Sequence, residues 1–245
     1  MRTALSGYGL LLRWQFLRMR REMVTLIVIQ VALALGIIYG LAFLIPNIDS
    51  RSAMFLATGA PTVALLLLGL TVVPQEVTRS RLTGEADYLA ALPVPRLAPP
   101  AAEVTFWLLA QLPGTALALV VAAVRFDFAL NINPAVIPAI VLVALTGAAV
   151  GYAMAMLVRP AVAQHLATFL SIAILLFSPI NFPADRLPEV LQAVHAVLPM
   201  KYMADLLRWS LTGLPAEGVA TAFGVVLLWC AAGIAASWRV AVRRR

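Results

Sequence analysis

Long apolar runs separated by short polar segments form the main pattern of this sequence. Six runs come close to the roughly 20 residues that a helix needs to cross a bilayer. These runs cover residues 23–45, 54–73, 104–124, 134–157, 161–180 and 218–238. They lack the alternation of a transmembrane strand, and a backbone in lipid must satisfy its hydrogen bonds internally. The pattern therefore predicts an all-α integral membrane protein with six transmembrane helices in a single domain, residues 1–245.

The composition supports the same class of protein. Hydrophobic residues make up 62% of the 245 residues, charged residues 12%, and the mean hydropathy is +0.95. So few charged residues cannot coat a soluble globule of this size, which excludes a soluble enzyme, a disordered tail and a nucleic-acid-binding domain. The single cysteine, Cys230, excludes an intrachain disulfide framework and a cysteine metal cluster, and we expect no metal site.

The placement of the basic residues predicts the orientation in the membrane. Most of the 18 lie before the first run, after the second and fourth runs, and in the C-terminal tail. Cytoplasmic segments carry the excess of arginine and lysine, so both termini should be cytoplasmic. The net charge of +7 is then explained by topology and anionic lipid rather than by nucleic acid. Lysine occurs only at Lys201, and this bias toward arginine favours a bacterial cell membrane.

The segment before the first run has an amphipathic helical pattern. Six apolar residues fall on one stripe: Leu5, Tyr8, Leu12, Phe16, Met19 and Met23. Arg13 and Arg20 lie just off its edge. We expect an interfacial helix at the cytoplasmic face, with Trp14 as an anchor and the arginines toward lipid phosphates.

A short helix is predicted in the polar segment after the second run. Thr83 is expected as its N-cap, and Glu85 and Asp87 fall in the first turn, where acids favour the helix dipole. Pro93 should end it at Leu92. Two turns are too short to be stable alone in water, so this helix needs a partner or the end of its own bundle. An ordinary interfacial loop is the alternative.

The sequence contains no energy source of its own. A P-loop requires a Gly-Lys pair, and the only lysine follows Met200. All acidic residues lie outside the six predicted spans, which argues against an ion-driven carrier. His165, the only histidine in a span, has no acid nearby in sequence for enzymatic catalysis. We therefore expect no enzyme in this chain and an energy source, if one is used, in another subunit.

Two further short helices are predicted between the fifth and sixth runs, over residues 187–198 and 200–211. At 1.5 Å per residue each is about 18 Å long, too short to span a bilayer. The pattern places six residues of the first helix on its inner face: Leu187, Val190, Leu191, Val194, Val197 and Leu198. It places Glu189, Gln192 and His195 on the opposite face. In the second helix the expected inner residues are Met200, Met203, Ala204, Leu207 and Leu211, with Lys201, Asp205 and Arg208 facing outward.

Two segments resemble a known family. The first runs from Glu76 to Arg96 and contains Leu-Thr-Gly-Glu-Ala-Asp-Tyr-Leu-Ala-Ala-Leu-Pro-Val-Pro-Arg. It is similar to the cytoplasmic loop of ABC type-2 exporter permeases, in which an acidic residue and Gly-Thr precede a short helix ending in Pro-Val-x-Arg. The second contains Ser-Pro-Ile-Asn-Phe-Pro from Ser178 and Leu-Pro-Met-Lys-Tyr-Met-Ala-Asp-Leu-Leu-Arg up to Arg208. It resembles the family's segment between spans five and six. The chain departs from the family in having Thr83-Gly84 where Gly-Thr is common.

The resemblance implies a pore formed by two permease chains, as a homodimer or a heterodimer, in contact with membrane lipids. Two separate ATP-binding-cassette subunits would bind ATP and magnesium, and this chain would hold no cofactor. The short helix would be the coupling helix that enters a cleft of the ATPase. The implied ATPase-coupling residues are Glu76, Thr83, Gly84, Glu85, Asp87, Tyr88 and Leu89.

Polar and aromatic residues in the spans are candidates for the translocation path. The set is Gln111, Gln164, His165, Phe169, Phe177 and Asn181. Hydrogen bonds between helices for the polar members, and lipid contact for the aromatic ones, are the alternatives. The spans carry no acid, so an amphipathic drug-like or lipid-like cargo fits better than an ion. Polysaccharide or haem-like cargo, and an ATP-independent carrier or channel, remain open at this point.

Overall fold

The computed structural model describes residues 2–40, 43, 49–95, 98–126, 131–213 and 218–243. Over these ranges every regular element is a helix and no strand occurs, so the chain is an all-α membrane protein as predicted. The end of the predicted first span and Arg96 lie outside the described residues.

The helices before the middle of the chain are α1 (Arg2–Leu35), η1 (Gly36–Gly40), α3 (Ser50–Leu67), η2 (Leu68–Val72), α4 (Val73–Leu82), α5 (Glu85–Ala91) and α6 (Ala98–Phe126). Those that follow are α7 (Val136–Leu157), α8 (Pro160–Phe177), η3 (Ala184–Arg186), α9 (Glu189–His195), α10 (Pro199–Thr212) and α11 (Val219–Arg243). The elements η1 and η2 are π-helical segments, and η3 is a 3₁₀ turn.

Five helical segments in the described ranges are long and apolar enough to cross a membrane. They are Gly7–Gly40, Arg51–Leu82, Ala101–Phe126, Val136–Leu157 and Val219–Arg239. The predicted fifth span corresponds to α8, which has 18 residues and whose apolar part is shorter, Val162–Phe177. The count of six spans therefore stays a prediction.

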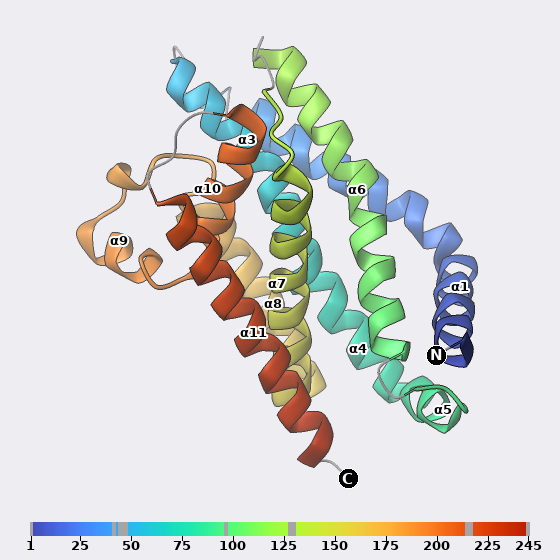
Figure 1. Ribbon diagram of the computed structural model, residues 1–245. Helices are drawn as coiled ribbons and strands as arrows, with labels where there is room; N and C mark the ends of the chain where they lie inside the picture. The colour runs from blue at the N-terminus through green and yellow to red at the C-terminus, as the bar shows by residue number, and fades with distance from the viewer. Residues whose placement is uncertain are drawn as a thin grey trace.

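The rod formed by α3, η2 and α4 lies at the centre of the bundle. In its most apolar stretch 83% of the residues are buried, compared with 22% in the first and last spanning helices. Helices α1, α6, α7, α8 and α10 all contact this rod, and α11 packs outside α7 and α10. Figure 1 shows both chain ends toward the end of the bundle that carries α5, which we call the terminal end. Helix α10 lies toward the opposite end.

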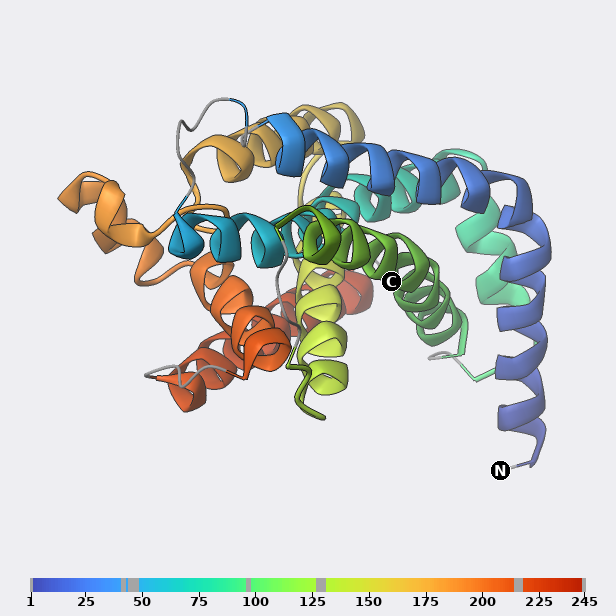
Figure 2. The same ribbon diagram turned by 90° about the horizontal axis from the view of Figure 1, so that it is seen from above.

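The amphipathic segment and the first span form one continuous helix, α1, instead of two separate helices. Figure 2 shows that α1 bends between its two halves. The predicted apolar stripe packs against protein: Met19 is 2% exposed, and the ring of Phe16 meets that of Phe106 on α6 at a centroid distance of 5.0 Å. Tyr8 donates a hydrogen bond to Thr105 on the same helix at 2.8 Å. Buried aromatic contacts of this kind fix the N-terminal half of α1 to α6.

Two glycines, Gly69 and Gly151, allow η2 and α7 to approach closely. A Cβ built at Gly69 would lie 2.5 Å from the carbonyl carbon of Gly147. A Cβ built at Gly151 would meet the carbonyl oxygen of Gly69 and lie 3.1 Å from Cδ of Pro74. In a membrane, where apolar burial gives little driving force between helices, such backbone contact is a main source of packing energy.

The two short helices differ from the predicted pair in which faces are buried. Helix α9 has only seven residues. Glu189 and Gln192 are exposed as predicted, but the predicted positions of its valines and of His195 were wrong. Its valines are exposed, with Val190 at 75% and Val194 at 45%, whereas His195 is buried at 6% and its Nδ1 lies 2.9 Å from the Leu191 carbonyl oxygen. The imidazole satisfies its polar group within the helix, so it can face the bundle while the valines face outward. The predicted inner face of α10 is confirmed: Met203, Ala204, Leu207 and Leu211 are buried, and Met200 packs against them.

Candidate functional site

A sharp turn at Thr83 and Gly84 separates α4 from the short helix α5. Thr83 caps the end of α4: its amide and its hydroxyl both donate to the Arg79 carbonyl oxygen, at 2.9 and 3.0 Å. The prediction of Thr83 as the N-cap of α5 is therefore wrong, because its hydroxyl bonds backward along the chain. The N-cap is Gly84, with φ of 74°, a conformation that glycine adopts without strain. Helix α5 carries Glu85 and Asp87 in its first turn, as predicted, and ends at Ala91, one residue before the predicted end at Leu92.

The side chains of α5 divide between a face on the bundle and a face away from it. Leu89 packs into an apolar cluster with Leu11 of α1 and Ala102 of α6. Asp87 and Tyr88 point outward, and Tyr88 is 64% exposed. Leu82, at the end of α4, is 74% exposed as well. The bundle therefore supplies the support that a two-turn helix needs, and an exposed apolar and acidic surface remains.

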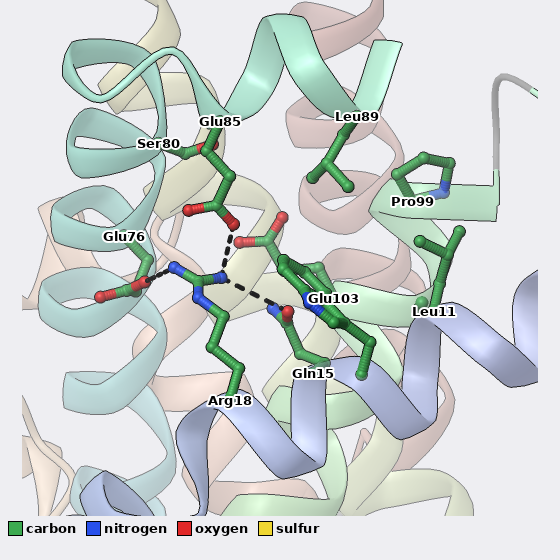
Figure 3. Close-up of a pocket in the computed structure, with 11 residues that line it drawn as sticks. Leu11, Gln15, Arg18, Glu76, Ser80, Glu85, Leu89, Pro99 and Glu103 are labelled. Carbon is green, nitrogen blue, oxygen red and sulfur yellow. Dashed lines mark hydrogen bonds and ion pairs between the residues drawn. The ribbon is translucent and has the colours of Figure 1, made fainter. Parts of the chain in front are cut away.

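An ion-pair cluster fixes the bundle face of α5 to α1 (Figure 3). Arg18 of α1 lies 2.6 Å from the Glu85 carboxylate and 3.6 Å from that of Glu76 on α4. Arg79 contacts Glu76 at 2.6 Å. The Arg18 guanidinium also lies 5.2 Å from the ring centre of Trp14. The Arg18, Glu76 and Glu85 side chains are only 16–20% exposed, so solvent screens these pairs less than it screens surface pairs.

A cavity of about 30 Å³ lies within this cluster. Its walls come from α1, α4, α5 and α6 and carry the carboxylates of Glu76, Glu85 and Glu103 and the Arg18 guanidinium. Figure 3 shows Glu85 and Glu103 turned toward the same space from different helices. Gln15 accepts a long hydrogen bond of 3.5 Å from Arg18. The ion pairs of Arg18 thus join α1 to α4 and α5, and α6 adds the Glu103 carboxylate to the cavity wall.

A second charged cluster lies toward the opposite end of the bundle, around Arg208. The prediction that Arg208 faces outward is wrong, because it is 8% exposed. Its guanidinium donates to Thr58 Oγ1 at 3.1 Å, to the Ile180 carbonyl oxygen at 2.9 Å and to Asp205 at 2.8 Å. It also lies 3.8 Å from the ring centre of Phe55. A buried charge requires such partners, which helical spacing alone does not reveal.

Burial changes the ionisation of this second cluster without discharging its cation. Desolvation lowers the pKa of Arg208 to about 10, and it raises the pKa of Asp205 above its ordinary value. The pKa of Arg208 stays well above neutral, so the guanidinium keeps its charge at pH 7. The Asp205 carboxylate is then the oppositely charged partner that a charged guanidinium in an apolar bundle needs.

The predicted path residues do not form one site. Gln164, His165, Phe169 and Phe177 are exposed on α8, with Phe169 at 66% and Phe177 at 53%. Gln111 of α6 is buried at 1%, and its side-chain amide has no hydrogen-bond partner within the described residues.

Two other polar residues in the bundle are buried like Gln111. Gln30 of α1 packs on Gly114 of α6, where a built Cβ would lie 2.8 Å from Cβ of Gln30. Asn181, which was predicted to line the path, is buried at 4% beside Gly59 of α3. Only the α8 members of the predicted set therefore share an accessible face.

Comparison with known protein families identifies the family to which this chain belongs. A family model described as ABC-2 type transporter matches residues 7–212. The chain belongs to the ABC-2 type transporter family. No curated protein sequence matches it. The family assignment makes the chain a transporter permease rather than an enzyme, and it implies partnership with an ABC ATPase.

The matched range of this ABC-2 permease includes both charged clusters and leaves α11 outside. Among the predicted coupling residues, the fold brings Glu76, Glu85 and Leu89 together against α1 and α6, and it leaves Asp87 and Tyr88 at the surface. Sequence reasoning missed Arg18, whose two acidic partners lie 58 and 67 residues further along the chain. Its only local signal was Gln15 one helical turn earlier.

Proposed function

We propose that this chain is the permease of an ATP-driven exporter and that α5 is its coupling helix. The observation that carries the proposal is the two-sided character of α5: one face is locked to Arg18, and the other presents Asp87 and Tyr88. Two separate ATPase subunits would bind ATP and magnesium and grip the exposed face. The ion pair of Glu85 with Arg18 would pass their movement to α1.

The proposal places the translocation path at a contact between two permease chains along α8. Gln164, His165 and Thr168 are exposed there, and all three precede Phe169 on the same helix. Polar side chains inside a membrane are unfavourable against lipid and are found facing protein or an aqueous cavity. A second copy of this chain placed against α8 would cover them and leave an amphipathic surface between the two subunits.

An amphipathic drug-like or lipid-like molecule fits such a surface. The polar residues lie near the start of α8, and apolar residues (Phe169, Ile172, Leu176 and Phe177) follow toward its end. A cargo with one polar group and one apolar body would match both parts. We propose export from a bacterial cytoplasm, in keeping with the arginine-rich segments at the terminal end.

The docking proposal predicts the effect of replacing Tyr88 with alanine. Exposed aromatic anchors carry much of the binding free energy of interfaces, so the amount of copurifying ATPase should fall about tenfold. Tyr88 is 64% exposed, so the permease itself should remain folded. Pull-down of the tagged permease from native membranes and quantitation of its P-loop subunit measure the effect.

The matched control is Val190→Ala, because Val190 is 75% exposed but lies on α9, toward the other end of the bundle. This variant should retain the ATPase fully. Equal retention by Tyr88→Ala, or cargo pumped uphill by vesicles that contain this chain alone, would contradict the proposal.

The pairing proposal predicts a disulfide between two copies at position 169. With Cys230→Ser in place, Phe169→Cys should give a crosslinked dimer on mild oxidation, because only residues near the symmetry axis come within disulfide distance of their own copy. Leu227→Cys on α11 is the control, since Leu227 is exposed to a similar extent, 60% against 66% for Phe169. A non-reducing gel gives the result. A crosslinked dimer of the Leu227→Cys chain, with none of the Phe169→Cys chain, would contradict the proposed pairing.

A further inference from the structure

Arg208 connects three separate parts of the chain through one side chain. Its Nε donates to Thr58 on α3 at 3.1 Å, its Nη1 to Asp205 on α10 at 2.8 Å, and its Nη2 to the carbonyl oxygen of Ile180 at 2.9 Å. Ile180 lies in the turn of residues 178–181 that ends α8. The planar guanidinium suits this arrangement because it can donate in several fixed directions at once.

The turn of residues 178–181 has few other polar contacts with the bundle. The amide of Ile180 bonds within the turn, to the Ser178 carbonyl oxygen at 2.8 Å. The Ser178 hydroxyl and the Asn181 side-chain oxygen are buried, at 1% and 4% residue exposure, without hydrogen-bond partners in the described residues. Buried polar atoms without partners are unfavourable, and both would gain water if the turn moved off the bundle. The bond from Arg208 is therefore the main polar contact that holds the turn in its closed position.

Gly59 of α3 provides the space for the closed turn. A Cβ built there would lie 2.7 Å from the Ile180 carbonyl oxygen and would also meet the Asn181 side chain. The turn thus sits directly on the α3 backbone, with Ile180 fully buried. It also lies at the end of the exposed α8 face along which the cargo is proposed to move.

From this geometry we propose that Arg208 is the latch of a gate: it holds the turn of residues 178–181 on α3 and releases it when cargo leaves. The bond that breaks is the one from Arg208 to the Ile180 carbonyl oxygen. The inference rests on the proposed path along α8, and it adds a positioning residue that the path itself does not require.

The test measures how fast a cysteine in the turn reacts. In a Cys230→Ser background, Asn181→Cys is labelled with a membrane-impermeant maleimide from the side opposite the termini. The labelling rate follows the population of the open turn. Adding Arg208→Met should raise it about tenfold, because the turn then lacks its main polar bond. Lys201→Met also removes a cation near Asp205 on the same helix, but it leaves the bond from Arg208 to Ile180 in place and should leave the labelling rate unchanged.

Two further variants separate opening of the turn from loss of the fold. Gly59→Ala pushes the turn off α3 without touching Arg208, and it should raise labelling in the same way. A second set of chains keeps Cys230 and carries only Arg208→Met or Gly59→Ala. In these chains Cys230 reports on the fold, because it is buried on α11. It should stay unreactive to N-ethylmaleimide. If Arg208→Met exposes Cys230, the fold of that variant is lost, and the labelling rate of Asn181→Cys with Gly59→Ala then decides whether the latch is correct.

The latch is overturned if labelling of the Asn181→Cys thiol stays slow when either Arg208→Met or Gly59→Ala is added. A purely structural role of Arg208 is distinguished by nucleotide: in membranes that contain the partner ATPase, ATP with vanadate should accelerate labelling of Asn181→Cys while Arg208 is intact. Unchanged labelling there would refute the release step. Absence of any copurifying ATPase would instead count against the proposed function. The labelling rates with and without Arg208→Met and Gly59→Ala would still test the latch.

Discussion

Glu85→Arg is expected to lower the free energy of unfolding of the permease by about 2 kcal/mol, a value between those of exposed and fully buried ion pairs. The substitution replaces a partner 2.6 Å from Arg18 with a like charge. For a chain of this length that corresponds to a fall of about 6 °C in the midpoint of thermal unfolding in detergent. We further expect ATP hydrolysis by the assembled transporter to lose its response to cargo, because α5 no longer moves with α1.

The charge-swapped pair tests whether the ion pair itself is responsible. Arg18→Glu combined with Glu85→Arg should recover part of the stability and of the cargo response. Recovery should be incomplete because Glu76 would then face a like charge at position 18. Asp87→Arg makes the same change of charge at an exposed position of the same turn and should leave the unfolding midpoint within about 1 °C. If the double variant is no better than Glu85→Arg alone, the pair does not transmit movement.

Gly151→Leu should be the most destabilising single change among those considered, at about 3 kcal/mol or more, because overpacking here is directed at backbone. A Cβ at this position already meets the Gly69 carbonyl oxygen, and the adjoining Pro74 leaves no direction of escape. Helices η2 and α7 would have to separate, which opens the most buried part of the bundle. The expected observation is a fall of about 9 °C or more in the unfolding midpoint, or failure to accumulate in the membrane.

The same substitution at Gly224 is the control. Gly224 is exposed on α11, and a Cβ there would meet nothing within 4 Å. Because leucine favours helix more than glycine does, Gly224→Leu should leave stability unchanged or raise it by about 0.5 kcal/mol. Similar midpoints for the two leucine variants would show that the close contact of η2 with α7 is not needed for the fold.

Most helices could be predicted from the sequence because the membrane demands long apolar runs and internally bonded backbone. The runs at 54–73 and 104–124 lie within helices that are long and apolar enough to span, and the run at 134–157 begins two residues before such a helix. The short helix α5 was predicted with its acidic first turn, since Glu85, Asp87 and Pro93 act locally. The position of its N-cap was wrong because a threonine after a helix can bond backward as readily as forward.

The faces of the short helices could not be predicted from spacing. Arg208 and His195 both have partners that make burial possible, and those of Arg208 come from α3 and from the turn after α8. The hydrophobic pattern classes both residues as polar and places them in solvent. The exposed valines of α9 fail in the opposite sense, because in a membrane protein an apolar side chain can face lipid or a partner instead of the core.

The sequence alone determined that this chain is a helical membrane protein and where most of its long helices run, because crossing a bilayer is a demand that local composition must meet. Only the tertiary structure decided which charges lie inside. Arg18 joins α1 to α4 and α5, and Arg208 joins α10 to α3 and the turn after α8. Each is stabilised by groups far away in the chain, since the energy of a buried charge depends on what folding places beside it and not on its neighbours in sequence.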